Sequence, residues 1–227
     1  MAGSSRRAFV RRHTRLQPVP GLDGVRLHLA DAIVPLWHAV AVETGDPDTP
    51  LPYWAFAWGG GLALAHHLRA HPDVVAGRRV FDLASGSGLC AIAALRAGAS
   101  AAMAADIDPF AHAAFGLNAR ANGARISVVA RDVLDDEPPD ADVVLVGDAC
   151  YDAGLAQRVL AWLQRADAAG LEVLLGDPGR RHLPTDALME LASYAVRTTT
   201  ELEDLDLRRG AVYRLRPSLS SPRRADR

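Results

Sequence analysis

The stretch Val80-Phe81-Asp82-Leu83-Ala84-Ser85-Gly86-Ser87-Gly88 decides the fold of this chain. Its apolar first half is typical of a buried parallel strand, and the Gly-Ser-Gly turn opens a helix predicted over Leu89–Ala97. A second apolar run, Ala101–Asp106, ends in a carboxylate 18 residues after Gly88. This order indicates half of a nucleotide-binding βαβ unit. In such a unit the glycines admit the ligand close to the backbone, and the later acid accepts hydrogen bonds from ribose hydroxyls.

The pattern Gly86-x-Gly88-x-x-Ala91 also matches the dinucleotide fingerprint, so the ligand has to be inferred from charge. Pyrophosphate binds at a helix N-terminus and is repelled by a neighbouring anion. Asp82, at the tip of the predicted strand, would repel pyrophosphate and attract a cation. S-adenosylmethionine carries a sulfonium and an ammonium and no phosphate. The stretch therefore favours a methyltransferase over a dehydrogenase, and a glycine turn that serves packing alone is the third alternative.

The composition is that of one globular α/β enzyme. The chain has 227 residues, of which 49% are hydrophobic and 23% charged, and no apolar run reaches the ~20 residues of a membrane span. Its two cysteines, Cys90 and Cys150, have no metal-ligand spacing, so we expect no metal site. All 25 basic residues are arginine, which with the many alanines suggests a GC-rich bacterial genome. We expect a cytoplasmic monomer.

The net charge of −2 hides a strong asymmetry. Residues 1–30 hold six arginines and one aspartate, and residues 207–227 hold seven arginines and one aspartate, which leaves −13 on the rest of the chain. An acidic body attracts cationic substrates and repels nucleic acid. The arginines of the two ends are accompanied by only one aromatic residue each, Phe9 and Tyr213, so we interpret the ends as solvated rather than as RNA-binding.

Strand-like and helix-like segments alternate along the chain, which predicts an α/β fold. We expect a doubly wound, mostly parallel, seven-stranded Rossmann-like sheet with the last strand antiparallel, plus a small N-terminal lobe. Residues 1–70 would form the lobe, 71–216 the ligand-binding domain and 217–227 a disordered tail. The expected strands are Arg79–Ala84, Ala101–Asp106, Arg125–Ala130, Ala141–Gly147, Leu171–Gly176, Ala195–Glu203 and Ala211–Arg216, with a turn at residues 208–210. The expected helices after the first are Phe110–Ala121, Gly154–Ala168 and Thr185–Ser193.

Several acids follow strand ends, where ligands bind in open α/β sheets. Asp106 is predicted to bind the ribose hydroxyls, and Asp108 is predicted to be structural or to cap the helix that starts at Pro109. Asp132 is predicted to accept a hydrogen bond from the adenine amino group, with an ordinary surface-loop acid as the alternative.

Asp148 and Tyr151 follow the fourth strand in the segment Gly147-Asp148-Ala149-Cys150-Tyr151. A carboxylate and an aromatic face can together hold an amine, through a charge-assisted hydrogen bond and cation–π attraction. The alternative is that Asp148 only caps the next helix. The aromatic segment Pro52–Trp58 is interpreted as a core plug, a wall over the cofactor, or both, with Trp58 in direct contact. The loop Gly176–Arg180 is predicted to lie on the substrate side.

Taken together these residues resemble the class I, seven-β-strand, S-adenosylmethionine-dependent methyltransferases. More narrowly the chain resembles the family of the electron-transfer flavoprotein β-subunit lysine methyltransferase, whose bacterial members are often labelled nicotinamide N-methyltransferases. The segments that carry the resemblance are Pro52–Trp58, Asp82–Leu89, Asp106–Pro109, Leu117–Ala119 with Asn122-Gly123, Gly147–Tyr151 and Gly176–Arg180. The class usually has Gly where this chain has Ala84, and we expect Ala84 to keep a negative φ that alters the turn slightly.

The resemblance implies methylation of an amine nitrogen, with a lysine of a protein such as the electron-transfer flavoprotein β-subunit as acceptor and no nucleic acid or membrane partner. A small-molecule amine or pyridine N-methyltransferase is the alternative, and a non-catalytic S-adenosylmethionine-binding module is a third possibility. The resemblance makes Asp148 and Tyr151 the catalytic pair. The expected cofactor-binding residues are Trp58, Asp82, Ala84, Gly86, Gly88, Asp106, Ile107, Asp132 and Asp148.

Overall fold

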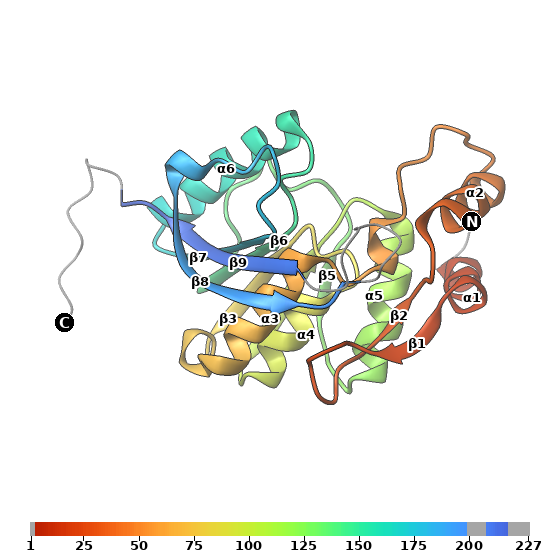
Figure 1. Ribbon diagram of the computed structural model, residues 1–227, viewed down its shortest axis with the longest axis horizontal. Coiled ribbons are helices and arrows are strands. Elements are labelled where there is room, and N and C mark those ends of the chain that lie inside the picture. Colours follow the sequence, from red (N-terminus) through yellow and green to blue (C-terminus); the bar gives the residue numbers. More distant parts are fainter. Residues whose placement is uncertain (1–2, 199–207, 218–227) are drawn as a thin grey trace.

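The computed structural model describes residues 3–198 and 208–217, and it confirms the predicted fold class (Figure 1). Within these residues seven strands form one sheet in the order β5-β4-β3-β6-β7-β9-β8. The pairs from β5 to β7 are parallel, and β9 lies antiparallel between β7 and β8. The strands are β3 (Arg79–Leu83), β4 (Ala101–Ala105), β5 (Ser127–Val129), β6 (Val143–Gly147), β7 (Glu172–Asp177), β8 (Leu188–Val196) and β9 (Arg208–Leu215).

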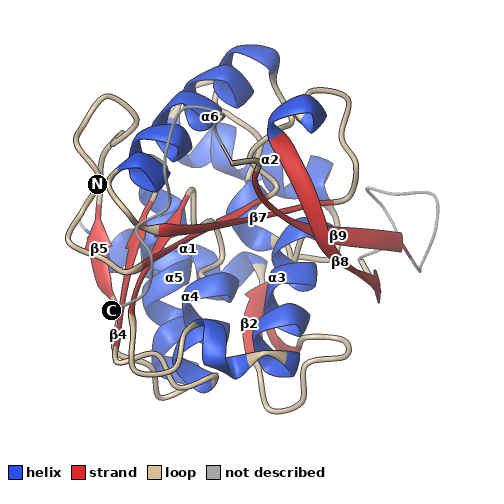
Figure 2. Ribbon diagram, turned by 90° about the vertical axis from the view of Figure 1, so that its left-hand side faces the viewer, coloured by secondary structure: helices blue, strands red, loops and turns tan. Residues whose placement is uncertain are grey.

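Helices cover both faces of this sheet (Figure 2). Strand β6 explains why, because its apolar residues alternate between two separate clusters. Val143 and Leu145 pack toward α3 and α4, whereas Val144 and Val146 pack toward α6. A strand buried on both faces has a continuous apolar run, as the sequence of β6 does. The helices that form these layers are α3 (Gly59–Ala70), α4 (Leu89–Arg96) and α5 (Pro109–Ala121) on one face, and α6 (Ala153–Ala168) on the other.

The N-terminal segment packs beside α5. It comprises α1 (Gly3–His13), a hairpin of β1 (Arg15–Pro18) and β2 (Arg26–Leu29), and α2 (Ile33–Thr44). Short 3-10 turns follow at Tyr53–Ala55 and Pro72–Val74. Helix α3 lies on the N-terminal side of the predicted boundary at residue 70, yet it packs on the main sheet. The boundary itself stays a prediction.

Two asparagines, one within α5 and one at its C-cap, hold β2 in place. The Asn118 side-chain oxygen accepts a hydrogen bond of 2.7 Å from the His28 backbone N–H. One turn later, the Asn122 side chain pairs with both backbone groups of Arg26, at 3.0 Å and 2.6 Å. Because these amides satisfy backbone groups of an edge strand, they fix the N-terminal hairpin against the main domain.

The end of the chain differs from the sequence prediction. The helix expected over Thr185–Ser193 is wrong, because only Thr185–Ala187 forms a 3-10 turn and the following residues form β8. Pairing with β9 on both sides of a register shift between Glu190 and Ala192 overrides the local helix preference of Leu, Met, Glu and Ala. The turn expected at residues 208–210 is also wrong, since β9 begins at Arg208. Of the strand expected over Ala195–Glu203, the first two residues belong to β8, which ends at Val196, and residues 197 and 198 are not in a strand. Residues 199–203 of that prediction, like the tail beyond residue 217, lie outside the described residues.

The sheet places a binding crevice at the carboxyl ends of β3 and β6. After β3 the chain forms β4 on one side of that strand, and it later returns to form β6 on the other side. The strand order therefore reverses between β3 and β6. Ligands of open α/β sheets bind at such a point. No helix among the described residues has the length and apolar character needed to cross a membrane.

Candidate active site

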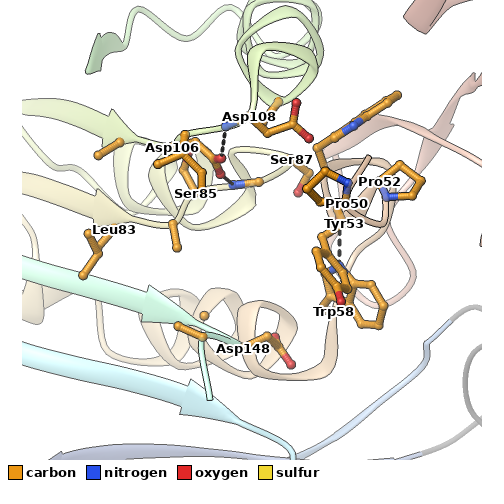
Figure 3. Close-up of a pocket in the computed structure, with 18 of the residues that line it drawn as sticks. Pro50, Pro52, Tyr53, Trp58, Leu83, Ser85, Ser87, Asp106, Asp108 and Asp148 are labelled. Atoms are coloured by element: carbon orange, nitrogen blue, oxygen red, sulfur yellow. Dashed lines mark hydrogen bonds between the residues drawn. The ribbon is translucent and has the colours of Figure 1, made fainter. Parts of the chain in front are cut away.

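A cavity of about 590 Å³ lies at these strand ends, within the ~300–1,000 Å³ typical of small-molecule sites. Figure 3 shows residues from several elements around it, with Asp106 and Asp148 on different strand ends and Tyr53 and Trp58 beside them. Gly88 is not among the lining residues. All the other predicted site residues line the cavity, namely Trp58, Asp82, Ala84, Gly86, Asp106, Ile107, Asp132, Asp148 and Tyr151.

The glycine loop contains a left-handed residue that the sequence does not predict. Ala84 has φ +53°, so the expectation of a negative φ is wrong. The left-handed conformation costs a residue with a Cβ roughly 1–2 kcal/mol. Gly88 has φ +79°, and a Cβ there would lie 2.2 Å from the Phe115 ring. Gly88 therefore lets α4 pack against α5, which is a packing role next to the cavity.

Asp82 lies at the end of β3 beneath this loop. Its Oδ2 accepts a hydrogen bond of 3.0 Å from the Ala91 backbone N–H, and its side chain is fully buried. Burial raises the pKa of Asp82 to about 7, against the lowering effect of that hydrogen bond. A carboxyl with this pKa gains a favourable interaction when a cation enters the cavity.

Asp106 ties the loop to the end of β4. Its Oδ2 accepts a hydrogen bond of 2.8 Å from the Gly86 backbone N–H, and its Oδ1 accepts one of 2.9 Å from Asp108 (Figure 3). Burial raises its pKa. Asp108 caps α5 by accepting a hydrogen bond of 2.7 Å from the Phe110 N–H, as predicted. Each Asp106 oxygen has a further lone pair, so the carboxylate can still accept hydroxyl donors.

Asp148 is held rigidly at the end of β6. Its φ is +56° and its backbone N–H donates to the Gly176 carbonyl at 2.9 Å. Its Oδ2 accepts a hydrogen bond of 2.8 Å from Gly61, and its Oδ1 accepts one of 3.0 Å from Arg180. Burial raises the pKa of Asp148 to about 6 although Arg180 lowers it. The alternative that it caps α6 is excluded, because Asp152 caps that helix.

The glycines that begin α3 make the contact to Asp148 possible. A Cβ on Gly60 would lie 2.1 Å from the Gly176 carbonyl oxygen and 2.7 Å from Asp148 Oδ2. Glycine therefore lets the N-terminus of α3 approach the ends of β6 and β7 directly. The positive end of this helix stabilises the buried carboxylate.

The aromatic segment contributes to both the core and the cavity. Trp54 is buried in the core and also lines the cavity, together with Tyr53 and Trp58. The contact of Trp58 with a cofactor stays a prediction. Trp58 donates a hydrogen bond of 2.8 Å to the Tyr53 carbonyl. Tyr53 packs against Tyr151 with ring centroids 4.9 Å apart, and Tyr151 is 45% exposed. The Arg180 guanidinium lies over the Trp58 ring, 5.5 Å from its centroid.

Asp132 lies at the exposed rim of the cavity. It accepts a hydrogen bond of 2.9 Å from the Leu134 N–H, which lowers its pKa, and it pairs with Arg158 at 3.0 Å. Its contact with adenine stays a prediction. The sequence does not identify Arg158 as a cavity residue. Arg158 lies within α6, and nothing in the helical pattern indicates that its side chain reaches Asp132, which follows β5. The sequence places Arg180 in a substrate-side loop, and spacing alone does not predict its pairing with Asp148.

Comparison with known proteins places this site among methyltransferases. A family model described as ribosomal protein L11 methyltransferase (PrmA) matches residues 65–147, from α3 to the end of β6. The electron transfer flavoprotein beta subunit lysine methyltransferase of Rattus norvegicus is 40% identical over 172 residues, which cover 73% of this chain and 68% of the relative. Its Xenopus laevis counterpart is 35% identical over 219 residues, covering 93% and 87%. A solved structure from Pyrococcus horikoshii, assigned to the RNA methyltransferases, covers 78% of this chain and 96% of its own with a TM-score of 0.53; at 16% identity it shows likeness of fold alone.

Proposed function

Because this chain belongs to the electron transfer flavoprotein beta subunit lysine methyltransferase family, we propose that it transfers a methyl group from S-adenosylmethionine to a lysine side chain of a folded protein. The electron transfer flavoprotein beta subunit, named in its relatives, is the first candidate acceptor. A small free amine is the alternative acceptor.

The residues around the cavity fit S-adenosylmethionine. The cofactor supplies a methyl group on a sulfonium, together with a ribose and a free ammonium. Asp106 has lone pairs for the ribose hydroxyls, and Asp82 lies where a cation would stabilise its ionised form. The glycine loop between them leaves room for the ligand against the backbone. The Asp82 carboxylate would repel the pyrophosphate of a dinucleotide, which supports the methyltransferase assignment.

One observation supports a lysine acceptor most directly: a buried carboxylate and an exposed aromatic ring line the same cavity. Asp148 is 7% exposed and Tyr151 is 45% exposed. A lysine side chain is long and apolar with a polar end. Its stem would pass the rings of Tyr53 and Tyr151, and its nitrogen would reach the Asp148 carboxylate. A side chain that belongs to another protein requires such a path from the surface to the buried Asp148 carboxylate.

In this arrangement Asp148 would orient the acceptor by accepting a hydrogen bond from its N–H, at about 3 Å. The lone pair of the amine can then point away from Asp148 and toward the methyl group, which is the alignment that a displacement needs. A free lysine has a pKa near ~10.4, so the amine must lose a proton before it attacks. No strong base is assigned to this step, and the proton is expected to pass to water.

The test is to incubate the protein with tritiated S-adenosylmethionine and recombinant electron transfer flavoprotein beta subunit, and to locate the label by peptide mapping. We expect label on lysine, and none on a beta subunit whose surface lysines have been changed to arginine. The chain has no lysine of its own, so any lysine-borne label lies on the acceptor.

Asp148→Asn and Tyr151→Phe serve as matched variants. Both should bind S-adenosylhomocysteine within a few-fold of the wild-type affinity while transferring label more slowly, and Asp148→Asn should be the slower because it removes a charge. Label that persists on the arginine-substituted acceptor, or that reaches only small amines such as nicotinamide, would reject the protein-lysine proposal and favour the small-molecule alternative.

A further inference from the structure

Arg180 places a permanent cation beside Asp148, at the end of the cavity where the lysine would bind. The turn after β7 fixes its backbone, because Asp177 Oδ1 accepts hydrogen bonds from the N–H groups of Gly179 and Arg180 at 2.8 Å and 2.7 Å. From there the guanidinium reaches Asp148 Oδ1 at 3.0 Å and lies over the Trp58 ring. Its side chain is 24% exposed, so solvent screens the charge only in part.

An amine oriented by Asp148 would have to lie close to this guanidinium. One hydrogen bond of 3.0 Å joins Arg180 to Oδ1 of the carboxylate. A second of ~3 Å would join the amine to the same carboxylate, so the two nitrogens would be within ~6 Å on a shared oxygen and within ~8 Å on different oxygens. The guanidinium does not deprotonate in proteins. At this separation and an effective dielectric constant of ~20, a like charge shifts the pKa of an ammonium down by on the order of 1–2 units.

We propose that Arg180 is a positioning residue that favours the uncharged, nucleophilic form of the acceptor lysine. This inference rests on the proposed function. The uncharged amine uses its lone pair to form the new N–C bond, while the S–C bond breaks and its electron pair stays on sulfur. The proton that the ammonium lost has already passed to water. Arg180 thus weakens the binding of the protonated lysine and raises the fraction that can react.

The other titratable groups around Arg180 do not cancel this effect near neutral pH. Burial raises the pKa values of Tyr53 and Tyr151, and it raises that of Cys150 to about 12, so these groups are uncharged there. Asp148 and Asp177 provide negative charge, and burial raises the pKa of each. The more distant carboxyls that act on Tyr151 are Asp106 and Asp152. Without Arg180 this set would hold an ammonium more tightly.

The experiment measures kcat against pH from 6.5 to 10 with saturating S-adenosylmethionine, for wild type, Arg180→Gln, Arg180→Lys and the neighbouring exposed Arg181→Gln. We expect the midpoint of the Arg180→Gln profile to move up by about one pH unit or more, with kcat about 10-fold lower at pH 7.5 and largely recovered at pH 10. Loss of Arg180 also raises the pKa of Asp148, which moves the profile in the same direction. Arg180→Lys keeps the charge and should stay near wild type, as should Arg181→Gln.

Binding provides a readout that does not depend on turnover. In the presence of S-adenosylhomocysteine, Arg180→Gln should bind the acceptor protein more tightly than wild type at pH 7, because the protonated lysine is no longer repelled. An unshifted kcat profile in Arg180→Gln would overturn the inference, as would equal loss of S-adenosylhomocysteine affinity in the Gln and Lys variants, which would make Arg180 a cofactor ligand. Absence of lysine label with the wild-type enzyme would instead refute the proposed function, so the two failures are distinguishable.

Discussion

Asn118 donates a hydrogen bond of 2.9 Å from its side-chain amide to the carbonyl oxygen of Ser87, across 31 residues of sequence. The same amide accepts the His28 N–H through its oxygen, and the side chain is fully buried. One residue of α5 therefore joins the glycine loop to β2 of the N-terminal hairpin. The hairpin is far from the cavity in sequence, but this contact makes it part of the support of the loop.

This relationship predicts that Asn118→Ala lowers both stability and cofactor affinity. The change leaves the buried Ser87 carbonyl and the half-buried His28 N–H without these hydrogen bonds, and each such loss costs about 1–3 kcal/mol. We expect the free energy of unfolding to fall by about 2–4 kcal/mol and S-adenosylhomocysteine to bind more weakly, as measured by denaturation and calorimetry. Asn122→Ala is the matched control, since its hydrogen bonds reach Arg26 and its own helix rather than the loop. Cofactor affinity of Asn118→Ala equal to that of the wild-type protein would contradict the link between the hairpin and the loop.

A second prediction concerns Asp106. Asp106→Ala should weaken the binding of S-adenosylhomocysteine by about 1.5–3 kcal/mol, the scale of hydrogen bonds to a charged group. Asp108→Ala is the control, because that residue caps α5 and should cost about 1 kcal/mol of stability with little effect on affinity. Calorimetry on both variants distinguishes these roles. The wild-type protein should not bind NAD, and binding of NAD in place of S-adenosylhomocysteine would make the methyltransferase proposal wrong.

The sequence predicts the centre of this fold because local patterns there coincide with tertiary structure. The apolar run of β3, the glycine turn and the acid after β4 are each encoded within a few residues. The edge of the sheet is different. Leu188–Val196 has residues that suit a helix, and only pairing with β9 makes it a strand. A pairing partner that is distant in sequence leaves no local signal.

The site shows the same division. The positions of Asp82, Asp106 and Asp148 follow from strand ends, so the sequence brings them to one edge of the sheet. The left-handed conformation of Ala84 does not follow, since it depends on the surrounding loop overriding a local preference. Nor does the ion pair of Arg180 with Asp148, which joins the ends of two different strands.

A third prediction uses Asp82, the fully buried carboxyl under the glycine loop. Its pKa is about 7 in the folded protein because burial disfavours the charged form, whereas an unfolded aspartate has a pKa of about 3.9. Between these values the folded state binds the proton and the unfolded state has lost it. The unfolded state therefore binds fewer protons, and stability falls as pH rises from about 4 to about 7, then levels off.

The measurement is urea denaturation of the ligand-free protein at several pH values between 4 and 8. Asp82→Asn keeps an acceptor for the Ala91 N–H and cannot ionise, so its stability relative to wild type should grow with pH by at most roughly 4 kcal/mol across the window. Asp148, whose pKa is also raised, is present in both proteins and cancels in this difference. Asp142→Asn is the control, because the hydrogen bond from Arg79 lowers the pKa of Asp142 to about 2, below the window. Its difference from wild type should stay constant. A constant difference for Asp82→Asn as well would mean that Asp82 is already ionised in the empty cavity, and that the attraction of a cationic cofactor has to come from the other carboxylates.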